Sequence, residues 1–164
     1  MNTEARKAGE VKQVTEVGRI QKQLERAFSG HAWHGPALME LLAGVNATRA
    51  AARPVPGAHS IWELVLHIAA WDQAVTRRLA GDRAELSDEE NFPAVNETTD
   101  DAWQRTLETL QRCHRELHEA IGGLEDTRLA EPILEGMPST YSTLHVLIQH
   151  DLYHAGQIAI LKKN

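Results

Sequence analysis

The sequence predicts an all-α fold, a four-helix bundle with an additional short helix after the first long helix. Apolar residues recur at steps of three and four along most of the chain, which is the period of a helix that buries one face. We find no convincing alternation of apolar and polar residues, the pattern that a half-buried strand would show. Glycine and proline residues separate the periodic segments and mark where the helices end.

Length and composition indicate one domain over residues 1–164, with residues 1–9 as a disordered or frayed terminus. The 164 residues, 42% of them apolar, suffice for one hydrophobic core. The net charge of -6, without a basic cluster, argues against nucleic acid or an anionic membrane surface as a partner. No apolar run approaches the roughly 20 residues of a membrane span, and the lone Cys113 excludes an intramolecular disulfide. Since the first residues do not resemble a signal peptide, we expect a cytoplasmic protein.

The first long helix is expected over residues 14–28, and Ser29 and Gly30 end it. Its apolar residues are Val14, Val17, Ile20, Leu24 and Phe28. The additional short helix is expected from Pro36 to Gly44, because the fixed φ of proline suits the first helical position. Two prolines and a glycine in residues 53–57 then interrupt the helical pattern.

The second long helix is expected to begin at Ser60 and to end at Gly81. Ser60 and Glu63 have the spacing of a capping box, in which each side chain accepts a hydrogen bond from the other residue's backbone N–H. The apolar stripe of this helix comprises Ile61, Leu64, Ile68, Trp71, Val75 and Leu79. His67 lies beside the stripe, so we expect it to point inward. Residues 82–97 lack periodicity and form either a long loop that borders a site or a solvated connector.

Two further long helices are expected. The first begins at Thr98 or Thr99 and extends to about Leu124, and the second extends from near Ser142 to about Leu161. The seam of the first carries His114 among its apolar residues. The last helix has polar residues at three seam positions where a bundle normally places leucines, namely His150, His154 and Gln157. Burying a polar group without a partner costs about 1 to 3 kcal/mol. These side chains therefore need partners, and a metal ion is one candidate.

The spacing of His150 and His154 suits two ligands of one ion. Residues four apart share a helix face, with Cβ atoms roughly 5 to 6 Å apart, so both imidazoles can reach the same metal. The signal is weak by itself, because nine histidines in this chain would give about 0.5 such pairs by chance. The alternative is that His150 and His154 are buried core residues that are satisfied by hydrogen bonds and bind no metal.

Apart from His67, His150 and His154, the histidines are not expected to ligate a metal. His114 and His118 repeat the four-residue spacing, but only His114 lies in its seam, where it is expected to be a hydrogen-bonded core residue. The remaining four adjoin helix breaks or caps or fall outside a seam, and we expect them to be surface or capping residues: His31, His34, His59 and His145.

Two segments together resemble the DinB-like family of small helical metalloproteins. They are HDLYHAGQI at residues 150–158 and IWELVLHIAAW at residues 61–71. The resemblance extends from about residue 12 to residue 162 and includes the WHGP turn at residues 33–36 and the PVPG connector at residues 54–57. It implies a four-helix bundle in which one histidine of a middle helix and two of the last helix bind a divalent ion, often nickel or zinc. By this similarity the ligands are His67, His150 and His154.

The resemblance also implies an activity. Three neutral imidazoles would leave the ion its double positive charge and at least one open coordination position, as in a catalytic site, and a bound water or thiol becomes more acidic there. Relatives transfer low-molecular-weight thiols such as bacillithiol, mycothiol or glutathione to small electrophiles, so we expect a metal-dependent thiol S-transferase. A metal-dependent hydrolase with the same ligands, or a non-enzymatic metal-binding or interaction protein, is the alternative. Resemblance and abundant apolar helix surface predict a homodimer.

Neighbours of the predicted ligands are candidates to orient the imidazoles. Among Asp151, Gln157, Glu63 and Asp72, the register favours Gln157, whose alternative role is a polar residue bonded to the backbone. Glu63 is expected to serve only the cap. Trp71 either walls a substrate pocket or belongs to the plain core. Cys113 is expected to be an inert, small hydrophobic residue.

Overall fold

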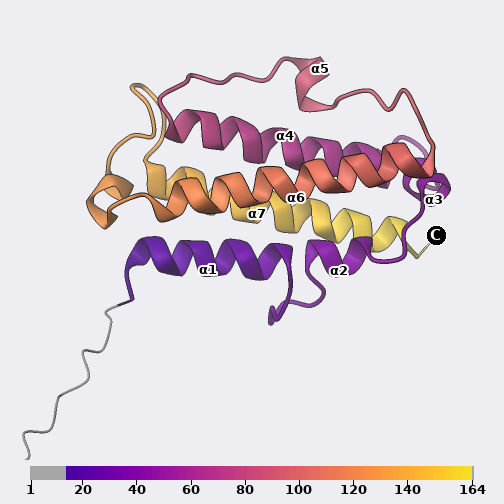
Figure 1. Ribbon diagram of the computed structural model, residues 1–164, viewed down its shortest axis with the longest axis horizontal. Helices are drawn as coiled ribbons and strands as arrows, with labels where there is room; N and C mark the ends of the chain where they lie inside the picture. Colours follow the sequence, from indigo (N-terminus) through magenta and orange to yellow (C-terminus); the bar gives the residue numbers. More distant parts are fainter. Residues whose placement is uncertain (1–13, 164) are drawn as a thin grey trace, which may run out of the picture.

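A computed structural model describes residues 14–163, and within them it is an all-helical protein built around four long helices (Figure 1). The long helices are α1 (Glu16–Phe28), α4 (Ile61–Leu79), α6 (Asp100–Gly122) and α7 (Thr140–Leu161). The short ones are α2 (Leu38–Leu42), α3 (Ala47–Ala51), α5 (Asp88–Asn91) and the 3-10 helix η1 (Asp126–Ala130). The predicted four-helix bundle is confirmed, whereas the predicted frayed terminus at residues 1–9 lies outside the described residues.

Each long helix packs against two of the others. α1 and α4 each contact α6 and α7. Figure 1 shows α1 and α7 running in one direction and α4 and α6 in the other. Because α4 and α6 are parallel neighbours, the connection between them, residues 80–99, has to return along the length of the bundle, and α5 lies within it. This topology explains the long aperiodic segment.

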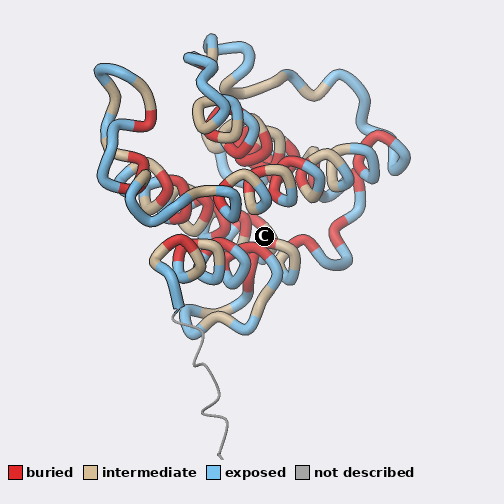
Figure 2. Tube along the Cα trace, turned by 60° about the vertical axis from the view of Figure 1, so that its left-hand side comes forward, coloured by how far each residue is buried: buried red, intermediate tan, exposed pale blue. Residues whose placement is uncertain are grey.

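The core fills the space between the helices. Figure 2 shows buried residues where the helices face one another and exposed residues around the outside. The predicted stripe of α4 is buried at Ile61, Leu64, Ile68 and Val75. Burial of each large aliphatic side chain contributes about 1.5 to 3 kcal/mol, so these amphipathic faces account for the arrangement of the helices. Within residues 14–163, no helix combines the length and the apolar character that a membrane span requires.

Side-chain caps fix the beginning of α4 and α6. The predicted capping box is present, with the Glu63 N–H donating to Ser60 Oγ at 3.2 Å and the Ser60 N–H donating to Glu63 Oε2 at 2.8 Å. Of the two threonines predicted to begin α6, Thr99 is the cap, and its Oγ1 accepts from the Ala102 N–H at 3.2 Å. Local hydrogen bonds thus determine where these helices start.

Three helix starts lie two residues away from the predicted positions. α1 begins after Thr15, whose hydroxyl caps it, and Val14 is 63% exposed instead of belonging to the core. α2 begins at Leu38, after Ala37, and not at Pro36. α7 begins before Ser142, because Ser139 Oγ accepts the Ser142 N–H at 3.1 Å. In each case a cap that the apolar pattern does not reveal determines the boundary.

Three short helical segments were not predicted. α3 follows Asn46, whose side chain accepts from the Arg49 N–H at 2.9 Å, and α5 follows a capping box formed by Ser87 and Glu90. η1 is a single 3-10 segment. Segments of four or five residues are too short to show a helical period, so only their caps mark them in the sequence.

Candidate metal centre

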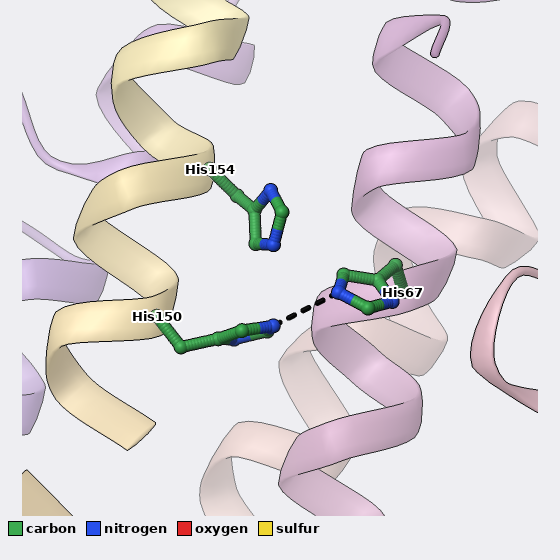
Figure 3. Close-up of side chains that lie close together, drawn as sticks. All are labelled: His67, His150 and His154. Atoms are coloured by element: carbon green, nitrogen blue, oxygen red, sulfur yellow. Dashed lines mark hydrogen bonds between the residues drawn. The ribbon is translucent and has the colours of Figure 1, made fainter. Parts of the chain in front are cut away.

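His67 on α4 and the pair His150 and His154 on α7 converge between these two helices. Figure 3 shows the three imidazoles pointing toward one another from the facing helices. One potential ligand atom from each ring lies within 4.8 Å of the others, and the Nε2 atoms of His67 and His150 are 2.9 Å apart. In the part of the chain that the structure describes, this is the only such group of three. The structure therefore brings together all three residues that the sequence singles out.

The outer nitrogen of each ring faces a hydrogen-bond acceptor. The acceptors of His67, His150 and His154 are, in this order, the Asn91 carbonyl oxygen at 2.6 Å, the Asp151 carboxylate at 3.2 Å and the Gln157 side-chain oxygen at 2.6 Å. A hydrogen on each Nδ1 satisfies these acceptors, and in that tautomer the Nε2 of each neutral ring carries a lone pair. Asp151 and Gln157 thus orient ligand candidates, as the sequence suggested.

The inward lone pairs make the cluster suitable for a cation. The Nε2 atoms of His67 and His150 lie 2.9 Å apart. In the tautomer with both Nδ1 atoms protonated, their lone pairs would face and repel each other, and a divalent ion bound by both nitrogens would remove that repulsion. Imidazole donors suit divalent transition metals such as zinc, nickel, copper and iron. The donor set and its outer hydrogen bonds therefore fit a metal site.

Burial keeps the three imidazoles neutral. It lowers the pKa of His67 from 6.5 to about 4, where the charges of His150 and His154 oppose protonation further and the bond to Asn91 favours it. Burial also lowers the pKa of His150 and of His154. An imidazole has to be neutral to ligate a metal, so these shifts favour binding.

A buried pair of carboxyl groups adjoins the histidines. Asp72 on α4 and Asp151 on α7 are both buried. Burial raises the pKa of both groups well above the usual range, and the charge of Asp151 raises that of Asp72 further. Neither carboxyl oxygen of Asp72 has a hydrogen-bond partner among the described residues. Because an ionised carboxylate could not be solvated there, Asp72 is the member that holds a proton, whereas Asp151 accepts from His150.

The connection between α4 and α6 covers one side of the site. The Phe92 ring stacks on the rings of His67 and His59, each at a centroid distance of 4.0 Å. The Trp71 Nε1–H donates to the side-chain oxygen of Asn91 at 2.9 Å. Of the two interpretations of residues 82–97, the structure therefore supports a loop that borders a site. His59 is exposed, as predicted, but its stacking contact was not predicted, because no pattern in the loop marks Phe92.

The remaining histidines lie apart from the cluster. His114 is buried, stacks on Phe28 and places Nε2 3.3 Å from Glu25, in agreement with the predicted hydrogen-bonded core residue. His118 lies beside Gln21, with its ring 6.4 Å from that of His114. His31 and His34 are exposed.

Two other predictions concern single side chains. His145 is only half exposed, and its Nε2 is buried without a hydrogen-bond partner among the described residues, so its assignment to the surface is wrong in part. Cys113 is buried and burial raises the pKa of its thiol, as expected of an inert side chain.

A cavity of about 430 Å³ reaches the histidine cluster. It lies between α4, α7 and the segment before α7, and both His150 and Trp71 line it. Trp71 is thus part of a pocket wall, which was one of its two expected roles. A second cavity, of about 260 Å³, is lined by His59 and Gln157 but by none of the three histidines. A small molecule in the first cavity can therefore contact the cluster at His150.

The fold and the site define a helical protein with three convergent imidazoles that could hold a divalent metal ion. The model of the DinB superfamily matches residues 32–158, a span that includes all three histidines. The chain therefore belongs to the DinB superfamily, and the resemblance found in the sequence is confirmed. No curated protein and no solved structure shows significant similarity to the chain.

Proposed function

We propose that this protein is a metal-dependent thiol S-transferase that binds nickel or zinc through His67, His150 and His154. The observation that carries the proposal is the convergence of three Nε2 atoms, each in a ring whose Nδ1 faces an acceptor. When bound, the ion would increase the acidity of a low-molecular-weight thiol, so that the thiolate is available at neutral pH.

The chain's own residues would orient the ligands and exclude water. Asn91, Asp151 and Gln157 hold the imidazoles by their outer nitrogens, while Phe92 and Trp71 shield the His67 side of the site. In the transfer itself, the thiolate sulfur forms a bond to an electrophilic carbon. The leaving group departs with the electron pair of the broken bond, and the thiol proton passes to solvent.

The size of the cavity beside His150 supports transfer over hydrolysis. A thiol transferase has to place two organic reactants beside the same ion, and this cavity has a volume of about 430 Å³. A hydrolase with the same three ligands needs space for only one organic substrate and a water molecule. Hydrolysis and simple metal storage are the outcomes that would replace the proposal.

Thiol consumption measures the proposed activity directly. We expect the metal-loaded protein to accelerate the reaction of bacillithiol, mycothiol or glutathione with monobromobimane at least about tenfold over the chelated protein, which is about 1.4 kcal/mol of barrier. Metal-loaded His118→Ala is the control and should retain the rate. If no thiol gives a metal-dependent rate, the transferase proposal is wrong. Metal-dependent cleavage of p-nitrophenyl acetate without thiol would then favour a hydrolase.

We also propose that the protein forms a homodimer through an exposed face of α7. Val146, Tyr153 and Ile160 recur every seven residues and are 60%, 65% and 61% exposed. Residues at this spacing lie on one face of a helix, and exposed apolar faces are typical of subunit contacts.

Light scattering tests the dimer. At micromolar concentration the protein should have twice the mass of one chain, and Tyr153→Glu should shift it toward the monomer. Val14→Glu changes an exposed apolar residue outside α7 and should leave the mass unchanged. A monomeric mass for the unaltered protein would refute the dimer.

A further inference from the structure

The larger cavity beside the histidines has an almost wholly apolar wall. α4, α7 and the segment between η1 and α7 enclose it, with a volume of about 430 Å³. This is within the usual size of pockets for small organic molecules. The apolar side chains that contribute to the wall include Trp71, Val75, Ile133, Met137, Val146 and Leu147.

The cavity extends from the metal-binding side chains to a cationic one. His150 and Arg78 both line it, and the Trp71 ring is close to each of them. The Trp71 ring is 6.0 Å from the His150 ring, and the Arg78 guanidinium carbon is 5.5 Å from the Trp71 ring centre. The distance between the Arg78 guanidinium carbon and the His150 ring centre is therefore no greater than the sum of these two distances. Trp71 and Arg78 are two turns apart on α4, which places them on the same helix face.

Arg78 has no anionic partner in the described part of the chain. Its Nε donates to the Ala84 carbonyl oxygen at 2.9 Å, and it forms no ion pair or further hydrogen bond within residues 14–163. The adjacent Arg77, by contrast, forms an ion pair with Asp82 at 2.7 Å. The Arg78 guanidinium is half-buried, and its two terminal nitrogens remain available as donors. Such a planar group can bind a carboxylate through two parallel hydrogen bonds.

We propose that this cavity binds an amphipathic carboxylate, such as a medium-chain fatty acid or an aryl-substituted acid. The apolar body would lie against Trp71, the carboxylate would pair with Arg78, and the opposite end would reach the histidines. The ligand's role as the electrophilic substrate rests on the proposed transferase function. Its binding does not, because neither Arg78 nor the apolar wall requires a metal ion.

Titration with octanoate tests the site. We expect the chelated protein to bind octanoate, measured by calorimetry and by tryptophan fluorescence, and Arg78→Met to weaken binding at least about tenfold. This corresponds to the loss of about 1.4 kcal/mol or more of binding free energy, as expected for a charge-assisted pair. Methionine keeps an apolar stem in the wall. Arg77→Met, one residue away and exposed, is the matched control and should bind as the unaltered protein does.

Two further measurements separate this proposal from its alternatives. Octylamine has the same apolar chain with the opposite charge and should bind at least about tenfold more weakly than octanoate. If octanoate binds only after metal is added, and equally in Arg78→Met, its carboxylate is on the ion and the proposal is wrong. Absence of octanoate binding to the chelated protein would also overturn it. Because the octanoate and octylamine titrations both use metal-free protein, failure of the transferase assay does not affect their outcome.

Discussion

His150→Ala should remove nearly all bound metal from the protein. The Nε2 atom of His150 lies 2.9 Å from that of His67 and is one of three nitrogens available to the ion. Loss of a residue that only orients a ligand typically costs 10- to 100-fold in metal affinity, so loss of a ligand should cost more than about 100-fold. Elemental analysis of purified protein and calorimetric titration with zinc or nickel would measure the change.

The chain offers a matched control in His118→Ala. His118 also lies four residues from another histidine on a long helix, but it does not belong to the three-histidine cluster. Its removal should leave metal content unchanged. Zinc at about 1,000 times its Kd should stabilise the unaltered protein and His118→Ala by about 4 kcal/mol, and that gain should fall to about 1.4 kcal/mol or less in His150→Ala. Equal metal content in the two variants would show that the ion is bound elsewhere.

Asp72→Asn should make the protein progressively more stable, relative to the unaltered chain, as pH rises. Burial raises the pKa of Asp72 well above 3.8, so the folded protein keeps a proton that the unfolded chain releases. The proton contributes its full stabilisation at pH values below the pKa of Asp72 in the unfolded chain. This stabilisation is lost as pH rises toward the pKa of Asp72 in the folded protein, at about 1.4 kcal/mol for each pH unit. Asparagine has no such proton, so the free energy of unfolding of Asp72→Asn lacks this dependence on pH.

Chemical unfolding of the chelated proteins between pH 4 and 8 would reveal the difference. The informative quantity is the free energy of unfolding of Asp72→Asn minus that of the unaltered protein, because titrating groups outside the Asp72–Asp151 pair contribute equally to both. Asp101→Asn, in the exposed first turn of α6, should run parallel to the unaltered protein. A constant difference for Asp72→Asn across this range would mean that Asp72 is ionised in the fold, contrary to its placement.

The four long helices could be predicted because each carries an amphipathic stripe of several turns. The stripe of α4, from Ile61 to Val75, is one example, and its burial provides much of the energy that holds the helix in the bundle. α3 and α5 are too short for any such pattern. Their caps at Asn46 and Ser87 were visible in the sequence, but comparable residues also occur in turns, so the caps alone could not identify helices.

The candidate site was predictable only in part. The pair His150 and His154 follows from helix geometry, whereas its meeting with His67 across 83 positions is a tertiary contact that spacing cannot reveal. The family resemblance provided that link. The stack on Phe92 and the proximity of Asp72 to Asp151 were missed, because they depend on how a connection folds back and on which faces of α4 and α7 meet.

The acceptor that orients His67 is a main-chain oxygen, and this affects how the site tolerates evolutionary change. Substituting the side chain of Asn91 cannot delete that oxygen, so its hold on the imidazole survives any point mutation that leaves the backbone in place. An insertion or deletion anywhere between residues 80 and 99 would instead shift the oxygen relative to α4. Changes in the length of the connection between α4 and α6 would therefore disturb the metal centre more than changes in its amino-acid composition.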